Sequence, residues 1–93
     1  MKAELLLRER YLLSENAFVE ARIWRLPAPV RGSSHSFKYS FAYIVDGACV
    51  LRYDNEAGKG DHRHVGVREE RYQFTGVEQL AADFWSDVRD WRR

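Results

Sequence analysis

The chain has 93 residues, enough for one modest hydrophobic core and too few for two, so we expect a single domain over residues 1–93. Apolar residues make up 45% and charged residues 31%, which is typical of a globular protein and excludes a disordered one. The 15 Lys and Arg against 14 Asp and Glu give a net charge of +1. This excludes a global field that attracts nucleic acid or an anionic membrane, so any site for a polyanion must be local.

The single cysteine, Cys49, excludes an internal disulfide and fits a reducing compartment. Its place in an apolar run predicts a small buried side chain. The three leucines at positions 5–7 are followed by charge and are too short for a signal sequence or a membrane span. We therefore expect a cytoplasmic protein with no membrane association.

Two hairpins are predicted from the alternation of apolar and polar residues. Residues 3–13 and 17–26 form the first, with a polar turn between them. Residues 37–45 and 48–53 form the second, and Asp46-Gly47 supplies the positive φ that a two-residue turn requires. This turn sets position 45 opposite 48 and position 39 opposite 54, which brings His35 and Lys38 near residues 53–64.

One helix follows, preceded by a short fifth strand or extended segment at residues 65–67. Thr75 and Glu78 predict a capping box at its start. An apolar stripe at helical spacing consists of Val77, Leu80, Ala81, Phe84, Trp85, Val88 and Trp91. The predicted fold is α+β: an antiparallel sheet of four to five strands in two hairpins, with one C-terminal helix packed on one face. Because one helix covers only part of such a sheet, Phe18 and Trp24 predict a homodimer or another bound partner.

The segment Tyr53-Asp54-Asn55-Glu56-Ala57-Gly58-Lys59-Gly60-Asp61-His62-Arg63-His64 has no apolar periodicity. It combines His, Lys, Arg and Asp, the side chains that transfer protons, hold phosphate or bind metal. We interpret it as a loop that carries the functional site and is mobile without ligand.

Several motifs resemble one known family. They are Ser33-Ser34-His35-Ser36-Phe37-Lys38-Tyr39, the 53–64 segment, Thr75-Gly76-Val77-Glu78-Gln79-Leu80 and Asp83-Phe84-Trp85. Together they resemble the TumE family of small bacterial toxins over nearly the whole chain. The resemblance implies a growth-inhibiting toxin encoded beside a helix-turn-helix antitoxin that neutralises it and represses the operon. It supplies no catalytic mechanism, so the chemistry is inferred from the residues.

The first hypothesis is RNA cleavage without metal or another cofactor. His62 and His64 alternate by one residue, so on an extended backbone they point the same way, and His35 would face them from the neighbouring loop. Histidines can act as general base and acid. The remaining catalytic candidate is Asp54, which like Asp61 could fix a histidine tautomer. The substrate-binding candidates are Lys38, Lys59, Arg63 and Tyr53, and Gly58 and Gly60 would let backbone N–H groups approach a phosphate.

Two alternatives stay open. His62, His64 and Asp61 could bind a Zn, Mn or Ni ion, for hydrolysis or for structure alone. The chain could instead be a binding module without catalysis, which occupies a target or binds a partner chain through its uncovered sheet face. The simplest interpretation of the 53–64 segment is that it only holds the antitoxin, with Arg63 paired to Glu69 or Glu70 on the surface.

Overall fold

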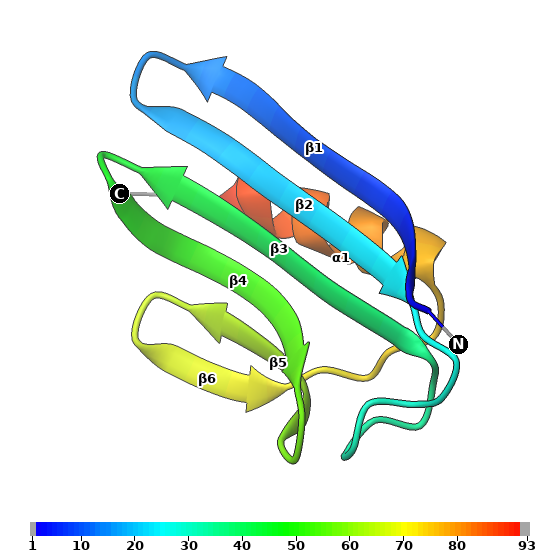
Figure 1. Cartoon of the computed structure of the whole chain (residues 1–93). Helices are drawn as coiled ribbons and strands as arrows, with labels where there is room; N and C mark the ends of the chain where they lie inside the picture. The colour runs from blue at the N-terminus through cyan, green and yellow to red at the C-terminus, as the bar shows by residue number, and fades with distance from the viewer. Residues whose placement is uncertain (1, 92–93) are drawn as a thin grey trace.

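The computed structural model describes residues 2–91 and consists of a twisted antiparallel sheet with one helix behind it (Figure 1). Six strands lie in the sheet in chain order, each paired with the next. The elements are β1 (Glu4–Ser14), β2 (Ala17–Arg25), β3 (Phe37–Val45), β4 (Ala48–Glu56), β5 (Gly60–Val65), β6 (Arg68–Arg71) and α1 (Val77–Asp90). The α+β prediction is confirmed, but the predicted count of four to five strands is too low.

The core lies between the sheet and α1. Alternate residues of β2, β3 and β4 point to the helix, as the apolar alternation predicts. The buried cluster consists of Val19, Ala21, Ile23, Tyr39, Phe41, Leu51, Tyr53, Leu80 and Phe84. The predicted helix stripe is confirmed, because α1 packs on the aromatic residues of the second hairpin. The ring centroids of Phe41 and Phe84 lie 5.3 Å apart, and those of Tyr43 and Trp91 lie 5.9 Å apart.

The turn of the second hairpin forms as predicted, but the register beyond it is shifted by one residue. Asp46 and Gly47 have φ of 52° and 78°, and Val45 pairs with Ala48. A β-bulge between positions 43 and 44 then places Ser40, instead of residue 39, opposite Asp54. The prediction of a buried Cys49 is also wrong: this residue pairs with Ile44 on the face of the sheet away from α1, and its side chain is exposed.

The 53–64 segment is a hairpin and not the predicted open loop. β4 continues to Glu56, a short turn follows, and β5 begins at Gly60. Asp54 pairs with His62, and Asn55 pairs with Asp61. Polar residues form these strands because both flanking strands offer them backbone partners, which local apolar periodicity does not reveal. This hairpin adds β5 to the predicted strands. The short strand or extended segment predicted at residues 65–67 is instead the end of β5 and the turn that leads to β6.

The start of α1 also differs from the prediction. Gly76, with φ of 153°, is the N-cap residue, and no side chain caps the helix by a hydrogen bond. The capping box of Thr75 and Glu78 is therefore wrong. α1 is also too short and too polar to cross a membrane, and it is the only helix in residues 2–91.

Candidate functional site

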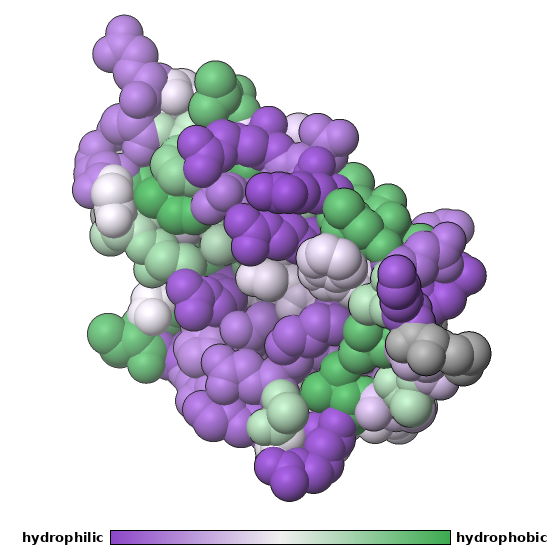
Figure 2. Space-filling view, in the orientation of Figure 1, coloured by the Kyte–Doolittle hydropathy of each residue, from purple (hydrophilic) through white to green (hydrophobic). Residues whose placement is uncertain are grey.

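The sheet divides the candidate residues between its two faces. Tyr53, Asp61 and Arg63 point to the α1 side, where they contact His35, Asp87 and other groups. Their neighbours alternate to the other face, which the helix leaves uncovered and which we call the open face. On the open face lie Lys38, Arg52, Asp54, His62 and His64. Figure 2 shows this face, which is mainly hydrophilic across its middle.

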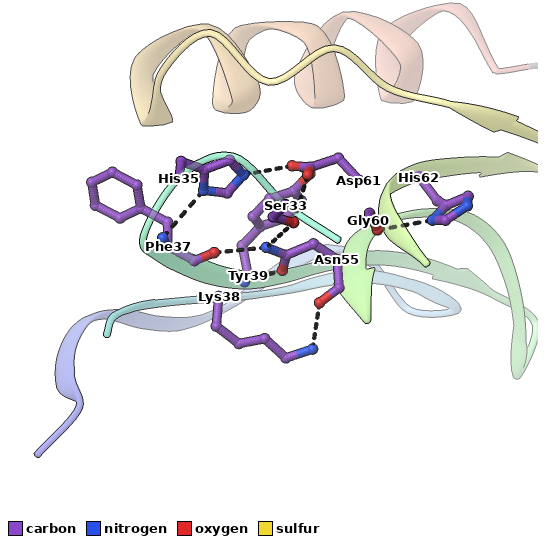
Figure 3. Close-up of polar contacts among 9 residues, drawn as sticks. All are labelled: Ser33, His35, Phe37, Lys38, Tyr39, Asn55, Gly60, Asp61 and His62. Atoms are coloured by element: carbon purple, nitrogen blue, oxygen red, sulfur yellow. Dashed lines mark hydrogen bonds and ion pairs between the residues drawn. The ribbon is translucent and has the colours of Figure 1, made fainter. Parts of the chain in front are cut away.

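His62 has one ring nitrogen that no side chain or backbone group of residues 2–91 occupies. Its Nδ1 lies 2.9 Å from the carbonyl oxygen of Gly60. A carbonyl oxygen only accepts hydrogen bonds, so Nδ1 carries a proton, and in the neutral ring Nε2 holds the lone pair. No described residue bonds that Nε2. Figure 3 shows His62 turned away from the polar cluster around Asp61. A neutral imidazole with an open Nε2 is suited to accept a proton.

His64 lies beside an acidic residue. Its Nε2 lies 3.2 Å from the Glu69 carboxylate on β6, a contact that becomes an ion pair when the ring is protonated. Arg52 lies directly opposite His64 in the β4–β5 register, and its side chain is exposed. Arg52 was missed by sequence reasoning, although it lies two residues before Asp54 and therefore on the same face of the strand.

His35 is on the other face, so the predicted meeting of three histidines is wrong. Its Nε2 donates to Asp61 at 2.7 Å, and its Nδ1 accepts from the backbone N–H of Phe37 at 3.2 Å. Its ring stacks on Phe74 with centroids 3.8 Å apart. Both ring nitrogens are therefore occupied. The prediction that His35 lies near the 53–64 segment is confirmed, but the residue it contacts there is Asp61 and not His62.

Asp61 is the centre of a buried polar cluster (Figure 3). Its carboxylate accepts from Ser33 Oγ, His35 Nε2 and Tyr39 Oη, each at 2.7 Å. Burial raises the pKa of Asp61, but the three hydrogen bonds outweigh it, so the pKa is lowered overall. For Tyr39, burial and the bond to Asp61 both raise the pKa of the phenol. The cluster fixes residues 26–36 against β5.

Asn55 completes this attachment. It is fully buried, with its Oδ1 accepting from the Tyr39 N–H at 3.0 Å and its Nδ2 donating to the Phe37 carbonyl at 2.6 Å. Its own carbonyl accepts from Lys38 Nζ at 2.6 Å. The prediction that Lys38 lies near the 53–64 segment is thus confirmed.

We expect the Asp61→Asn variant to be less stable than the wild type at neutral pH, and the difference to shrink in acid. Because the pKa of Asp61 is lower in the folded protein, its contribution is present above the unfolded-state value of about 3.9 and is lost as pH falls through the folded value. Urea midpoints of both proteins, measured from neutral pH into the acid range, check this. A difference that stays constant with pH would show that Asp61 stabilises the fold in some other way.

Tyr53 and Arg63 anchor the helix and do not face an open surface. Tyr53 is fully buried, and its hydroxyl donates to Asp87 on α1 at 2.5 Å. Burial and the bond to Asp87 raise its pKa. Arg63 binds Glu70 on β6 and reaches Asp87 at 3.4 Å. The predicted pairing of Arg63 with Glu70 is confirmed, and both side chains are occupied by contacts within the fold.

The glycines of the turn after β4 allow close packing of the backbone and do not form an open loop that could bind phosphate. The N–H of Gly58 donates to the Arg31 carbonyl at 2.6 Å, and the N–H of Lys59 donates to the Glu56 carbonyl at 3.1 Å. A Cβ on Gly60 would lie 2.7 Å from the Gly32 carbonyl oxygen, so this approach requires glycine. Lys59 itself is exposed at the turn, 3.8 Å from Glu56. The expected use of these two backbone N–H groups for phosphate is therefore wrong.

The alternative metal ligands do not converge. His62 and His64 point to the open face, whereas Asp61 points to the α1 side and is bound to His35. Within residues 2–91, no group of three or more His, Cys, Asp or Glu side chains is placed to hold a metal ion.

The fold and its polar surface define a small α+β protein in which one sheet face is covered by a helix and the other carries two histidines among basic residues. The family model for toxin TumE matches residues 2–92, in agreement with the family that the sequence motifs resemble. The chain belongs to the TumE toxin family. Neither the search of curated proteins nor that of solved structures gave a match.

Proposed function

We propose that this toxin inhibits growth by cleaving RNA on the open face of its sheet, with His62 and His64 as the proton-transfer pair. The observation that supports this most is that the two rings share one face and have different neighbours. Nδ1 of His62 contacts the Gly60 carbonyl and its Nε2 has no bond to a described residue, whereas Nε2 of His64 lies 3.2 Å from the Glu69 carboxylate.

The reaction that fits this pair is internal transfer at a ribonucleotide. His62 Nε2 takes the proton of the 2′-hydroxyl, and the 2′-oxygen forms a bond to phosphorus. The bond from phosphorus to the 5′-oxygen breaks, and His64, which must enter the step as an imidazolium, gives that oxygen a proton and becomes neutral. The products are a 2′,3′-cyclic phosphate and a 5′-hydroxyl, and His64 has lost the proton that His62 gained.

Charged neighbours of the pair have roles in the same scheme. Arg52, opposite His64, would stabilise the negative charge that develops on the phosphoryl oxygens. Asp54, opposite His62, would stabilise the imidazolium that forms when His62 accepts its proton. Lys38 lies on the same face, near the turn between β4 and β5, and adds positive charge. Of the predicted substrate-binding residues, Lys38 is therefore the one we retain.

Purified toxin is expected to cleave single-stranded RNA in the presence of a strong chelator. The proton-transfer scheme uses only side chains of the chain, whereas a metal-bound hydroxide would be lost on chelation. The measurement is product analysis, with a 2′,3′-cyclic phosphate as the expected end group. Growth should stop when the chain is expressed alone and continue when its antitoxin is expressed with it. Growth arrest without any RNA cleavage would favour the alternative of a non-catalytic binding module.

The partner in this proposal is a protein antitoxin, and β1 is the surface that best fits it. β1 is the longer of the two edge strands, with 11 residues against 4 in β6, and it leaves one row of backbone groups unpaired. It also carries much of the exposed apolar surface, including Leu12, which is 76% exposed. Pairing with a second copy about Glu9 would set Glu9 against itself and Arg8 against Arg10, and like charges in opposition are unfavourable. The charges therefore favour an antitoxin strand over a homodimer.

A further inference from the structure

Two arginines lie directly opposite one another on the open face. Arg8 on β1 pairs in register with Arg22 on β2, and both side chains are exposed. Like charges directly opposite in a sheet are destabilising. Within residues 2–91, neither guanidinium has an ion-pair partner: the nearby Glu20 binds Arg10 at 3.0 Å. Folding gains no ion pair from this arrangement, and both guanidinium groups can therefore contact an anion from solvent.

Small residues form the floor beside these arginines. Ser40 and Ala42 on β3 lie next to Arg22 and Glu20 of β2 and separate them from Arg52 on β4. A shallow hollow of about 260 Å³ lies above them, lined by Arg22 on one side and Arg52 on the other. A second hollow, lined by Arg8 and Arg22, continues to β1. The arginines thus border a groove across the strands.

The groove leads to the proposed proton-transfer pair. Arg8, Arg22, Ser40, Asp54 and His62 occupy one row across the sheet, because each is the register partner of the next. Neighbouring strands lie about 4.8 Å apart, so three spacings separate Arg22 from His62, about 14 Å. This distance suits a bound chain of a few nucleotides and exceeds what a single phosphate spans.

The charge of the open face supports an anionic ligand. Its cations are Arg8, Arg10, Arg22, Lys38, Arg52 and Arg71, and its acids are Glu20, Asp54, Glu56 and Glu69. The excess of two positive charges contrasts with +1 for the whole chain. Three of the acids have a basic neighbour: Arg10 for Glu20, Lys59 for Glu56 and His64 for Glu69. The open face is therefore more positive than the chain as a whole, which favours an anionic ligand there.

We propose that this groove binds the phosphate backbone of single-stranded RNA and guides it to His62. Arg8 and Arg22 hold phosphates on one side of the reacting nucleotide, and Arg52 contacts the backbone beside it. The proposal rests on the proposed function, because it assigns a substrate path to the same face. Arg8 and Arg22 act on affinity and not on proton transfer, so binding and cleavage respond to different substitutions.

Binding of a fluorescent single-stranded oligoribonucleotide tests the groove. The measurements use full-length His62→Ala/His64→Ala protein, so that the RNA stays intact. Adding Arg8→Gln and Arg22→Gln removes two phosphate contacts. We expect weaker binding and a slope of log K against log salt that is shallower by about 1.4, since each contact to a single strand contributes about 0.7.

The matched control is Arg25→Gln with Arg68→Gln, which removes the same charge from the α1 side of the sheet. It should leave the salt slope nearly unchanged. Equal losses of RNA affinity in both double variants would mean that only the overall charge matters. That result would overturn the proposal that RNA binds in the groove. Unchanged RNA binding with weakened antitoxin binding after the Arg8 and Arg22 substitutions would overturn it too, because the groove would then hold acidic side chains of a protein.

The outcomes separate the groove from the cleavage mechanism. If cleavage depends on His62 and His64 but the Arg8 and Arg22 substitutions leave RNA binding intact, the assignment of the groove as the RNA-binding site is wrong and the proposed function stands. If those arginines control RNA binding but the protein cleaves no RNA, the groove stands and the proposed function is wrong.

Discussion

Loss of growth inhibition is expected for both His62→Ala and His64→Ala, together with a fall of about 10²–10⁴-fold in the rate of RNA cleavage. Both histidines are half-buried on the open face, and neither ring takes part in the aromatic packing under α1. The loss should therefore occur without unfolding. Cleavage rates, growth on induction and melting temperatures of the variants check this.

Two further variants separate proton transfer from positioning. His62→Gln keeps a polar side chain that can bond the Gly60 carbonyl but cannot transfer a proton, so it should be as inactive as His62→Ala. Glu69→Gln keeps the shape next to His64 and removes the charge, so its cleavage rate should fall less and its pH profile should shift. Full toxicity in the double alanine variant would refute the histidine mechanism and leave a binding module.

The second hairpin and the helix were predictable because each has a strong local signal. The Asp46-Gly47 turn forms with the two positive φ values that its residue types favour. The helix stripe ends in aromatic residues whose burial needs a facing sheet. Local chemistry and tertiary packing agree at both places, so sequence reasoning alone was sufficient.

The placement of the site was only partly predictable, because it depends on register. One bulge changes the partner of Asp54, and alternation along β5 then decides which face each side chain reaches. The expectation that His62 and His64 share a face agrees with the strand geometry. The expectation for His35 failed because its loop folds over the α1 side and bonds to Asp61.

Buried polar networks were the main source of error in the sequence interpretation. Tyr53, Asn55 and Asp61 lie in a polar segment, and polar residues are usually exposed. In this fold they are buried or nearly so, since each has hydrogen-bond partners from another segment. The partners come from Ser33 to Tyr39 and from α1, so only the tertiary structure shows that these residues hold the fold together.

Phe84→Ala is expected to cost about 3–5 kcal/mol of unfolding free energy, a large share of the stability of a small domain. Phe84 is fully buried, and its ring centroid lies 5.3 Å from that of Phe41 and 5.4 Å from that of Tyr53. Truncation leaves a cavity between α1 and the sheet, which the two aromatic rings cannot fill without moving. Urea and thermal unfolding of the purified variant measure the loss, and the melting temperature should fall by roughly 15–30 °C.

Trp85→Ala is the matched control for this core substitution. Trp85 lies one residue further along α1 and is only half-buried, with its ring edge-on to Tyr11 at 5.3 Å on the outer strand. Because solvent already reaches this side chain, its removal creates less buried void, and the variant should lose clearly less stability than Phe84→Ala. A larger loss for Trp85→Ala would mean that the main contact between helix and sheet lies at β1, near the exposed edge, instead of over β3 and β4.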